Sequence, residues 1–176
     1  MASSIAQVFL FAAVSFRASA SASQPKASPE AQQKFWALTE RIAVALPGDG
    51  RDLQKLIPPS VPRSDASASK TRNEQRAVIG PSLFADDVAV VMSKNNRADS
   101  VSFDLAGSCI PFSSVRKRHP SILVINHAAS DLEWNTLGTQ VGDSVIAFWF
   151  KGTKFGCMRR VEITPAAATL SRLNVD

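Results

Sequence analysis

Apolar residues recur at helical spacing in the segment that follows residue 28. Four of them, at steps of three and four residues, share one face of an α-helix: Phe35, Leu38, Ile42 and Ala45. Ser28 can cap the first turn, and the Pro47-Gly48 pair ends the pattern. We therefore predict a helix from residue 29 to about residue 46, and a short second helix over 52–57.

The second half of the chain changes to short apolar runs that are typical of strands. Five such runs are predicted strands: 88–92, 101–105, 122–126, 144–151 and 155–163. The links KNNRADS and KGTK are short and turn-like, so the strands that they join should pair antiparallel. Helices first and strands later predict an α+β fold, with the N-terminal helices packed on a curved, mainly antiparallel sheet of about five strands.

The first residues are typical of an export signal. An apolar run, IAQVFLFAAVSF, fills residues 5–16 and is followed by RASASAS, which offers two small-x-small cleavage sites. The first four residues carry no Lys or Arg, so a transit peptide and an ordinary N-terminal helix stay open as alternatives. We expect a signal peptide over 1–22. No later apolar run reaches the ~18 residues that cross a bilayer, so we expect a secreted or periplasmic product with no transmembrane segment after cleavage.

Composition divides the remainder of the chain into three parts. We expect a linker over 23–28, a single α+β domain over 29–165 and a C-terminal tail over 166–176. Within the domain, residues 64–77 are polar and charged and almost without large apolar side chains. We expect them to form a mobile loop.

Composition also removes several kinds of chemistry. Two Cys, two His and no Tyr exclude Cys-rich zinc modules and multi-histidine cages, so we expect no metal and no cofactor. The net charge of +5 favours anionic partners such as lipid headgroups or cell-wall polymers. It is not concentrated into the stripe of a nucleic-acid binder, so we expect no nucleic-acid partner.

One basic run is the candidate contact for an anionic surface. It consists of Arg116, Lys117 and Arg118, and a solvated loop is the alternative interpretation. An anion-binding face could also include four further basic residues: Lys151, Lys154, Arg159 and Arg160. His119, which follows directly, is expected to be a solvated turn residue.

Cys109 and Cys157 are predicted to form a disulfide. Each continues the apolar alternation of a predicted strand, so both should point to the apolar side of the sheet. An even cysteine count in an exported protein indicates a bridge. If the chain is not exported, two buried thiols are the alternative.

The order of the predicted elements resembles the NTF2-like superfamily. The resemblance covers roughly residues 29–165 and rests on a helix pair ending near DLQKLIPPSV, on LFADDVAVV, and on the hairpin VIAFWFKGTKFGCMRRVEI. It implies a conical domain in which a curved sheet wraps around a helix. Enzymes of this group place acidic and histidine side chains in the cone, so the resemblance implies that Asp87 supplies a carboxylate to a pocket. His127 is the candidate partner for proton transfer, and a polar turn is the alternative for each residue.

The predicted strand over 144–151 is apolar on both sides. Ile146, Phe148 and Phe150 share one face, while Val145, Ala147 and Trp149 share the other. One face should meet the first helix, and the other needs a ligand, a partner subunit or a further layer.

We therefore predict a small exported domain that binds a ligand or partner without catalysis. Phe148, Trp149 and Phe150 are the candidate ligand-binding residues, and the partner is an apolar small molecule or a second copy of the chain. Two alternatives remain open: an NTF2-like enzyme that uses the Asp87 and His127 pair, and a module that interacts or dimerises through a sheet face.

Export can be tested at the N-terminus of the mature chain. We expect N-terminal sequencing of material secreted by the native host to begin near Ser21 or Ser23, because both cleavage sites follow the apolar run. Recovery of the chain with an intact Met1 from a cytosolic fraction would contradict export.

Overall fold

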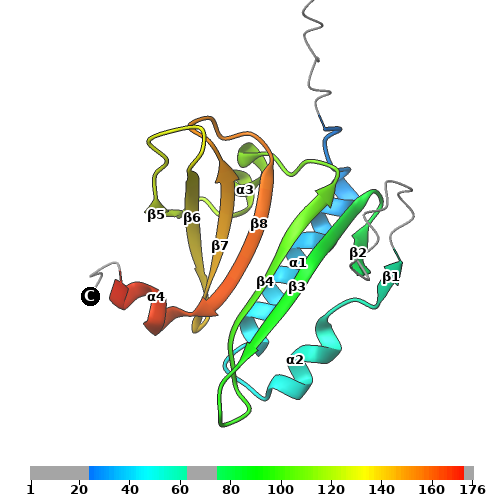
Figure 1. The fold of residues 1–176 in the computed structure, drawn as a ribbon, viewed down its shortest axis with the longest axis vertical. Coiled ribbons are helices and arrows are strands. Elements are labelled where there is room, and N and C mark those ends of the chain that lie inside the picture. Colours follow the sequence, from blue (N-terminus) through cyan, green and yellow to red (C-terminus); the bar gives the residue numbers. More distant parts are fainter. Residues whose placement is uncertain (1–23, 63–74, 173–176) are drawn as a thin grey trace, which may run out of the picture.

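The protein folds around one antiparallel sheet covered by helices (Figure 1). The computed structural model describes residues 24–62 and 75–172. The sheet has eight strands in the order β1-β2-β3-β4-β8-β7-β6-β5, and every neighbouring pair is antiparallel. The predicted α+β class and the mainly antiparallel sheet are confirmed, whereas the predicted number of about five strands is too low.

Two helices precede the first strands, and two more flank the last four strands. The helices are α1 (Pro29–Ala45), α2 (Gly50–Leu56), α3 (Phe112–Arg118) and α4 (Ala166–Arg172). The first four strands are β1 (Ser60–Pro62), β2 (Gln75–Gly80), β3 (Leu83–Met92) and β4 (Ala98–Gly107). The last four strands are β5 (Leu123–Asn126), β6 (Trp134–Val141), β7 (Ser144–Lys151) and β8 (Met158–Pro165).

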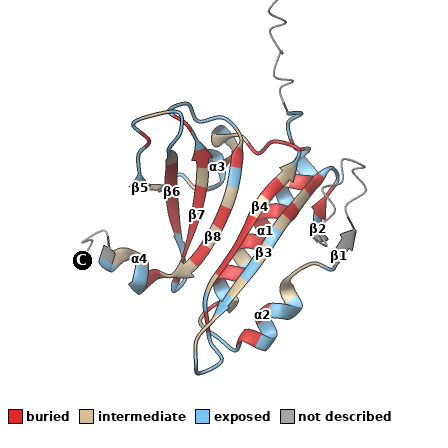
Figure 2. Ribbon diagram, viewed as in Figure 1, coloured by how far each residue is buried: buried red, intermediate tan, exposed pale blue. Residues whose placement is uncertain are grey.

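Helix α1 forms where the apolar spacing predicts it. The Ser28 hydroxyl accepts a hydrogen bond from the Ala31 amide at 3.1 Å and caps the helix. Phe35, Leu38 and Ile42 are buried against the sheet, and Figure 2 shows buried residues on the side of α1 that faces the strands. The helix is therefore held by its apolar face, as expected for an amphipathic segment.

The sheet opens into two parts that α1 holds together. The strands β4 and β8 pair over only four residue pairs, from Val101 with Ile163 to Asp104 with Arg160. Beyond these residues the two strands diverge in Figure 1. Helix α1 contacts β2 in one part and β6, β7 and β8 in the other, so it braces the bent sheet across this short junction.

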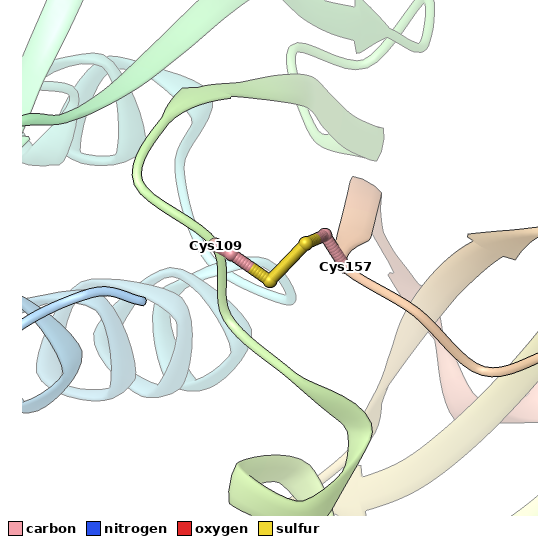
Figure 3. The surroundings of a disulfide bond; sticks show 2 residues. All are labelled: Cys109 and Cys157. Carbon is pink, nitrogen blue, oxygen red and sulfur yellow. A yellow bond between two sulfur atoms is a disulfide. The ribbon is translucent and has the colours of Figure 1, made fainter. Parts of the chain in front are cut away.

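A disulfide joins Cys109 to Cys157, which confirms the predicted pairing (Figure 3). The two Cα atoms lie 5.1 Å apart, and 48 positions separate the residues in sequence. The cysteines lie just outside the strands, since β4 ends at Gly107 and β8 begins at Met158. The bridge therefore ties the segment after β4 to the loop between β7 and β8.

Residues 25–27 belong to the domain, which corrects this part of the linker predicted over 23–28. The Cys109 amide donates to the Pro25 carbonyl at 2.7 Å, and the Ala27 amide donates to the Cys109 carbonyl at 2.8 Å. This short pairing fixes the chain immediately before α1. The sequence could not predict this pairing, because the segment consists of polar and small residues and its partner lies more than 80 residues away.

Three strands were missed by the hydrophobic pattern, namely β1, β2 and β6. The strand β6 carries buried polar residues, Asn135, Thr136 and Thr139, which interrupt the apolar pattern by which strands are recognised. The start of β2 falls within the predicted loop 64–77, and residues 64–74 of that loop lie outside the described residues. Likewise, the predicted tail begins with helix α4, and the predicted signal peptide over 1–22 is not described.

The outer side of β7 is partly covered by the chain itself. Val145 is 0% exposed and Ala147 is 8% exposed, although both lie on the face opposite α1. A Cβ atom at Gly138 would lie 2.7 Å from Cδ1 of Ile125 and 3.2 Å from Cγ1 of Val145, so the Ile125 side chain packs against this glycine. Helix α4 also contacts β7. These two residues therefore need no ligand or partner subunit to be buried.

The contribution of the disulfide can be measured with Cys157→Ser. We expect the free energy of unfolding to fall by about 4 kcal/mol, because the bridge limits the unfolded chain over a loop of this length. A loss of this size should lower Tm by roughly 10 °C in calorimetry. Reductant should produce the same decrease in the wild-type protein and none in the variant. Equal wild-type Tm values with and without reductant would contradict this role.

Candidate functional site

A groove lies between α1 and α3 and includes the segment before α1. Its volume is about 740 Å³, which is the size of a small-molecule site. Ten residues line it: Lys26, Pro29, Gln32, Gln33, Trp36, Ala37, Glu40, Ser114, Lys117 and Arg118. The lining therefore combines an apolar centre with amides and charged groups around it.

Cations outnumber carboxylates in the groove. Lys26, Lys117 and Arg118 line it, whereas Glu40 is its one acidic lining residue. Lys26 comes from the segment that pairs with Cys109, and the other two cations come from α3. The three basic residues are exposed. A bound anion would meet them without first entering the protein core.

An ion pair between α1 and α3 fixes one side of the groove. The Arg118 guanidinium donates to both carboxylate oxygens of Glu40, at 2.8 Å and 2.7 Å. This hydrogen bonding lowers the pKa of Glu40 and raises the pKa of Arg118. Because the guanidinium is half exposed, the pair positions α3 more than it stabilises the fold.

His119 is buried behind the groove, which corrects the prediction that it is a solvated turn residue. Only 10% of its side chain is exposed. Its ring stacks on Phe148 with centroids 5.7 Å apart and meets Trp36 edge-on at 5.5 Å. Helix α3 ends at Arg118 and so directs the next residue back onto α1, which the local sequence could not indicate.

The His119 imidazole has no hydrogen-bond partner at Nε2 among the described residues. This nitrogen lies 4.0 Å from the nearer carboxylate oxygen of Glu40. Burial lowers the pKa of His119; the Glu40 carboxylate acts in the opposite direction, and Arg118 lowers the pKa further. The ring is therefore held in its neutral form more strongly than a solvated histidine.

Asp87 and His127 are not brought together. Asp87 is exposed on β3, and His127 is exposed directly after β5. The strands β4, β8, β7 and β6 lie between them in the sheet, and neighbouring strands are about 4.8 Å apart. Neither residue lines the groove. Direct proton transfer between the two side chains is therefore excluded by this arrangement.

The three candidate ligand-binding residues of β7 also do not share a cavity. Phe148 and Phe150 are 0% exposed and belong to the core on the α1 side. Trp149 lies on the opposite face, where its ring meets Trp134 edge-on with centroids 6.1 Å apart. Phe148 does not line the groove but packs against Trp36, which does; the two ring centroids lie 5.9 Å apart.

The basic run on α3 divides between two environments. Lys117 and Arg118 line the groove, whereas the Arg116 guanidinium lies over the Phe112 ring at 5.9 Å. The groove residues on α1 were missed, although a second stripe at helical spacing marks them: Pro29, Gln33, Trp36, Ala37 and Glu40. That stripe could have been read from the sequence, but its pairing with α3 is a tertiary contact.

Comparisons with protein-family models, with curated proteins and with solved structures find no match.

Within the described ranges, 24–62 and 75–172, no cluster of three or more His, Cys, Asp or Glu residues could hold a metal ion. In the same ranges no helix has the length and apolar character needed to span a membrane. The candidate site is therefore interpreted from its own geometry.

The burial of His119 predicts a loss of stability in mild acid. The folded pKa lies below the unfolded value near ~6.5, so the unfolded state takes up the proton first as pH falls. We expect urea denaturation to give a lower free energy of unfolding at pH 5.5 than at pH 7.5. Glu40 acts in a separate window: its folded-state pKa is lowered, so its contribution is lost only as pH falls from the unfolded value of about 4.5 through the lower folded pKa.

His119→Phe should remove this dependence between pH 7.5 and 5.5, since phenylalanine keeps the ring contacts and cannot be protonated. The matched control is His127→Ala, which replaces the exposed histidine. A pH dependence that survives in His119→Phe and disappears in His127→Ala would contradict the assignment.

Proposed function

We propose that this protein is a small exported binding domain of NTF2-like architecture, without catalysis, whose groove between α1 and α3 binds an amphipathic anion. The observation that carries the proposal is the lining of the groove, in which three exposed cations, Lys26, Lys117 and Arg118, accompany apolar surface from α1. A ligand with an apolar body and one anionic group matches this combination.

The architecture is supported by the order and shape of the elements. A helix pair precedes the strands, and a bent antiparallel sheet packs around α1. This arrangement agrees with the curved sheet around a helix that the resemblance implies. Export is supported by the disulfide, which persists in oxidising compartments and is rare in the cytosol.

The chemistry of the ligand follows from the two sides of the groove. Pro29 and Ala37 offer exposed apolar surface from α1, next to the largely buried Trp36. Lys26 and Lys117 come from separate segments, so an anionic group between them would contact two ammonium groups. Charge-assisted contacts of this kind give an anion a clear advantage over a neutral ligand of the same shape.

A binding role is favoured over catalysis by the position of the titratable groups. His119 is the histidine nearest the groove, but it lies behind Trp36 and does not line the groove. The Glu40 carboxylate already accepts two hydrogen bonds from Arg118. The Arg118 guanidinium lowers the pKa of Glu40 and so makes this carboxylate a weaker base, while His119 does not reach the groove.

The proposal can be tested with the fluorescent aromatic sulfonate ANS, displaced by decyl phosphate. We expect saturable binding, displacement by decyl phosphate, and little displacement by uncharged decyl maltoside. Lys26→Gln combined with Lys117→Gln should weaken binding of both anions about tenfold, since two charge-assisted contacts are lost.

The matched control is Lys94→Gln combined with Lys154→Gln, which removes the same charge at two exposed lysines outside the groove. This control should bind as the wild type does. Equal weakening in both double variants would indicate a general charge effect, and undiminished binding in the groove variant would place the ligand elsewhere.

A further inference from the structure

A second hollow lies on the face of the sheet opposite α1. Its volume is about 450 Å³, and Asp104, Leu105, Trp134, Lys151, Arg159 and Arg160 line it. The lining comes from four strands, β4, β6, β7 and β8, so it belongs to the rigid part of the fold. None of these residues lines the groove between α1 and α3, and the hollow is therefore a separate site.

An indole ring and an ammonium group are already in contact in this hollow. The Lys151 Nζ atom lies over the Trp134 ring, 4.8 Å from its centroid, and the two residues face each other across β6 and β7. The ammonium also donates to the Leu132 carbonyl. These two contacts restrict Lys151, so less conformational entropy is lost when it meets a ligand.

Arg160 is also held in place. Its guanidinium donates to the Ser102 hydroxyl at 3.0 Å and lies 3.5 Å from the Asp104 carboxylate. It stands between Asp104 on β4 and Trp149 on β7 in the register of the sheet. Asp104 neutralises part of the charge of Arg160. The lining of the hollow nevertheless contains three cations and one carboxylate.

A bulge in β8 brings a second arginine to the same hollow. Trp149 pairs with Arg160, but the next residue, Phe150, pairs with Met158, which leaves Arg159 as the extra residue. Consecutive residues of a regular strand point to opposite faces, whereas a bulge redirects a side chain. Both Arg159 and Arg160 line the hollow as a result. Bulges of this kind are common beside functional sites.

We propose that this hollow binds a sulfated polysaccharide, with one sugar ring against Trp134 and its sulfate groups against Lys151, Arg159 and Arg160. Three cations and one half-buried indole ring line the hollow, which suits a polymer with several anionic groups on each sugar ring. A nucleic acid carries one phosphate per nucleotide, and its binding sites typically combine a basic groove with several stacking aromatics. The hollow is shallow and crosses four strands, so a chain can pass through it without threading.

The test uses dextran sulfate as the probe and neutral dextran as its control, with the full protein and isothermal titration at moderate salt. We expect saturable binding of dextran sulfate and none of dextran. Lys151→Gln combined with Arg159→Gln should weaken binding about tenfold, because two charge-assisted contacts are lost. Trp134→Leu should weaken binding at least as much, because the contact between the indole ring and the sugar ring is lost. Calorimetry can check that this variant is folded.

The matched control is Lys94→Gln combined with Arg51→Gln, which removes one lysine and one arginine at exposed positions away from the hollow. It should bind as the wild type does. Three results would overturn the proposal: no binding of dextran sulfate, equal weakening in the control, or tighter binding of single-stranded oligothymidine that depends on the same residues. Loss of ANS binding through Lys26 and Lys117 would concern the other groove alone, so the two proposals fail separately.

Discussion

The fold depends on the packing of α1 against both parts of the sheet. Only four residue pairs connect β4 to β8, so backbone hydrogen bonds join the two parts of the sheet over a short stretch and need the support of the helix. The apolar face of α1 contacts β2 on one side and β6, β7 and β8 on the other. Burial of large side chains such as Phe35, Phe103 and Phe148 supplies most of the favourable free energy, and it does so only if the sheet bends around the helix.

This constraint leaves the opposite face of α1 available for the groove. The groove needs two further segments beside that face, and each is fixed by its own contact. Arg118 forms hydrogen bonds with Glu40 and orients α3. The strand-like pairing of Lys26 with Cys109 fixes the segment before α1. The disulfide then joins that same region to the loop before β8. The groove is therefore assembled from segments far apart in sequence.

Sequence patterns predicted the features that depend on local periodicity or on composition. Helix α1, strand β7 and the Cys109–Cys157 pair were found in this way. Strand β6 was missed because its buried Asn135 and Thr136 are polar. The Asn135 amide donates to the Gly152 carbonyl, a contact that is set by the tertiary fold. The burial of His119 and the bulge at Arg159 could not be predicted from the sequence for the same reason. Both arise from how distant segments pack, and neither has a local sequence signal.

The two sides of β7 explain why the sequence pattern predicted a ligand on this strand. Phe148 and Trp149 are neighbours, so they point to opposite faces of the sheet. Phe148 packs beneath Trp36, which forms the floor of the groove, and Trp149 packs edge-on against Trp134, which lines the hollow. Phe148 is 0% exposed and Trp36 is 7% exposed, so this phenylalanine supports the ring that lines the groove. The apolar character of β7 on both faces therefore reflects packing beside two separate surfaces, and neither Phe148 nor Trp149 lines the groove or the hollow.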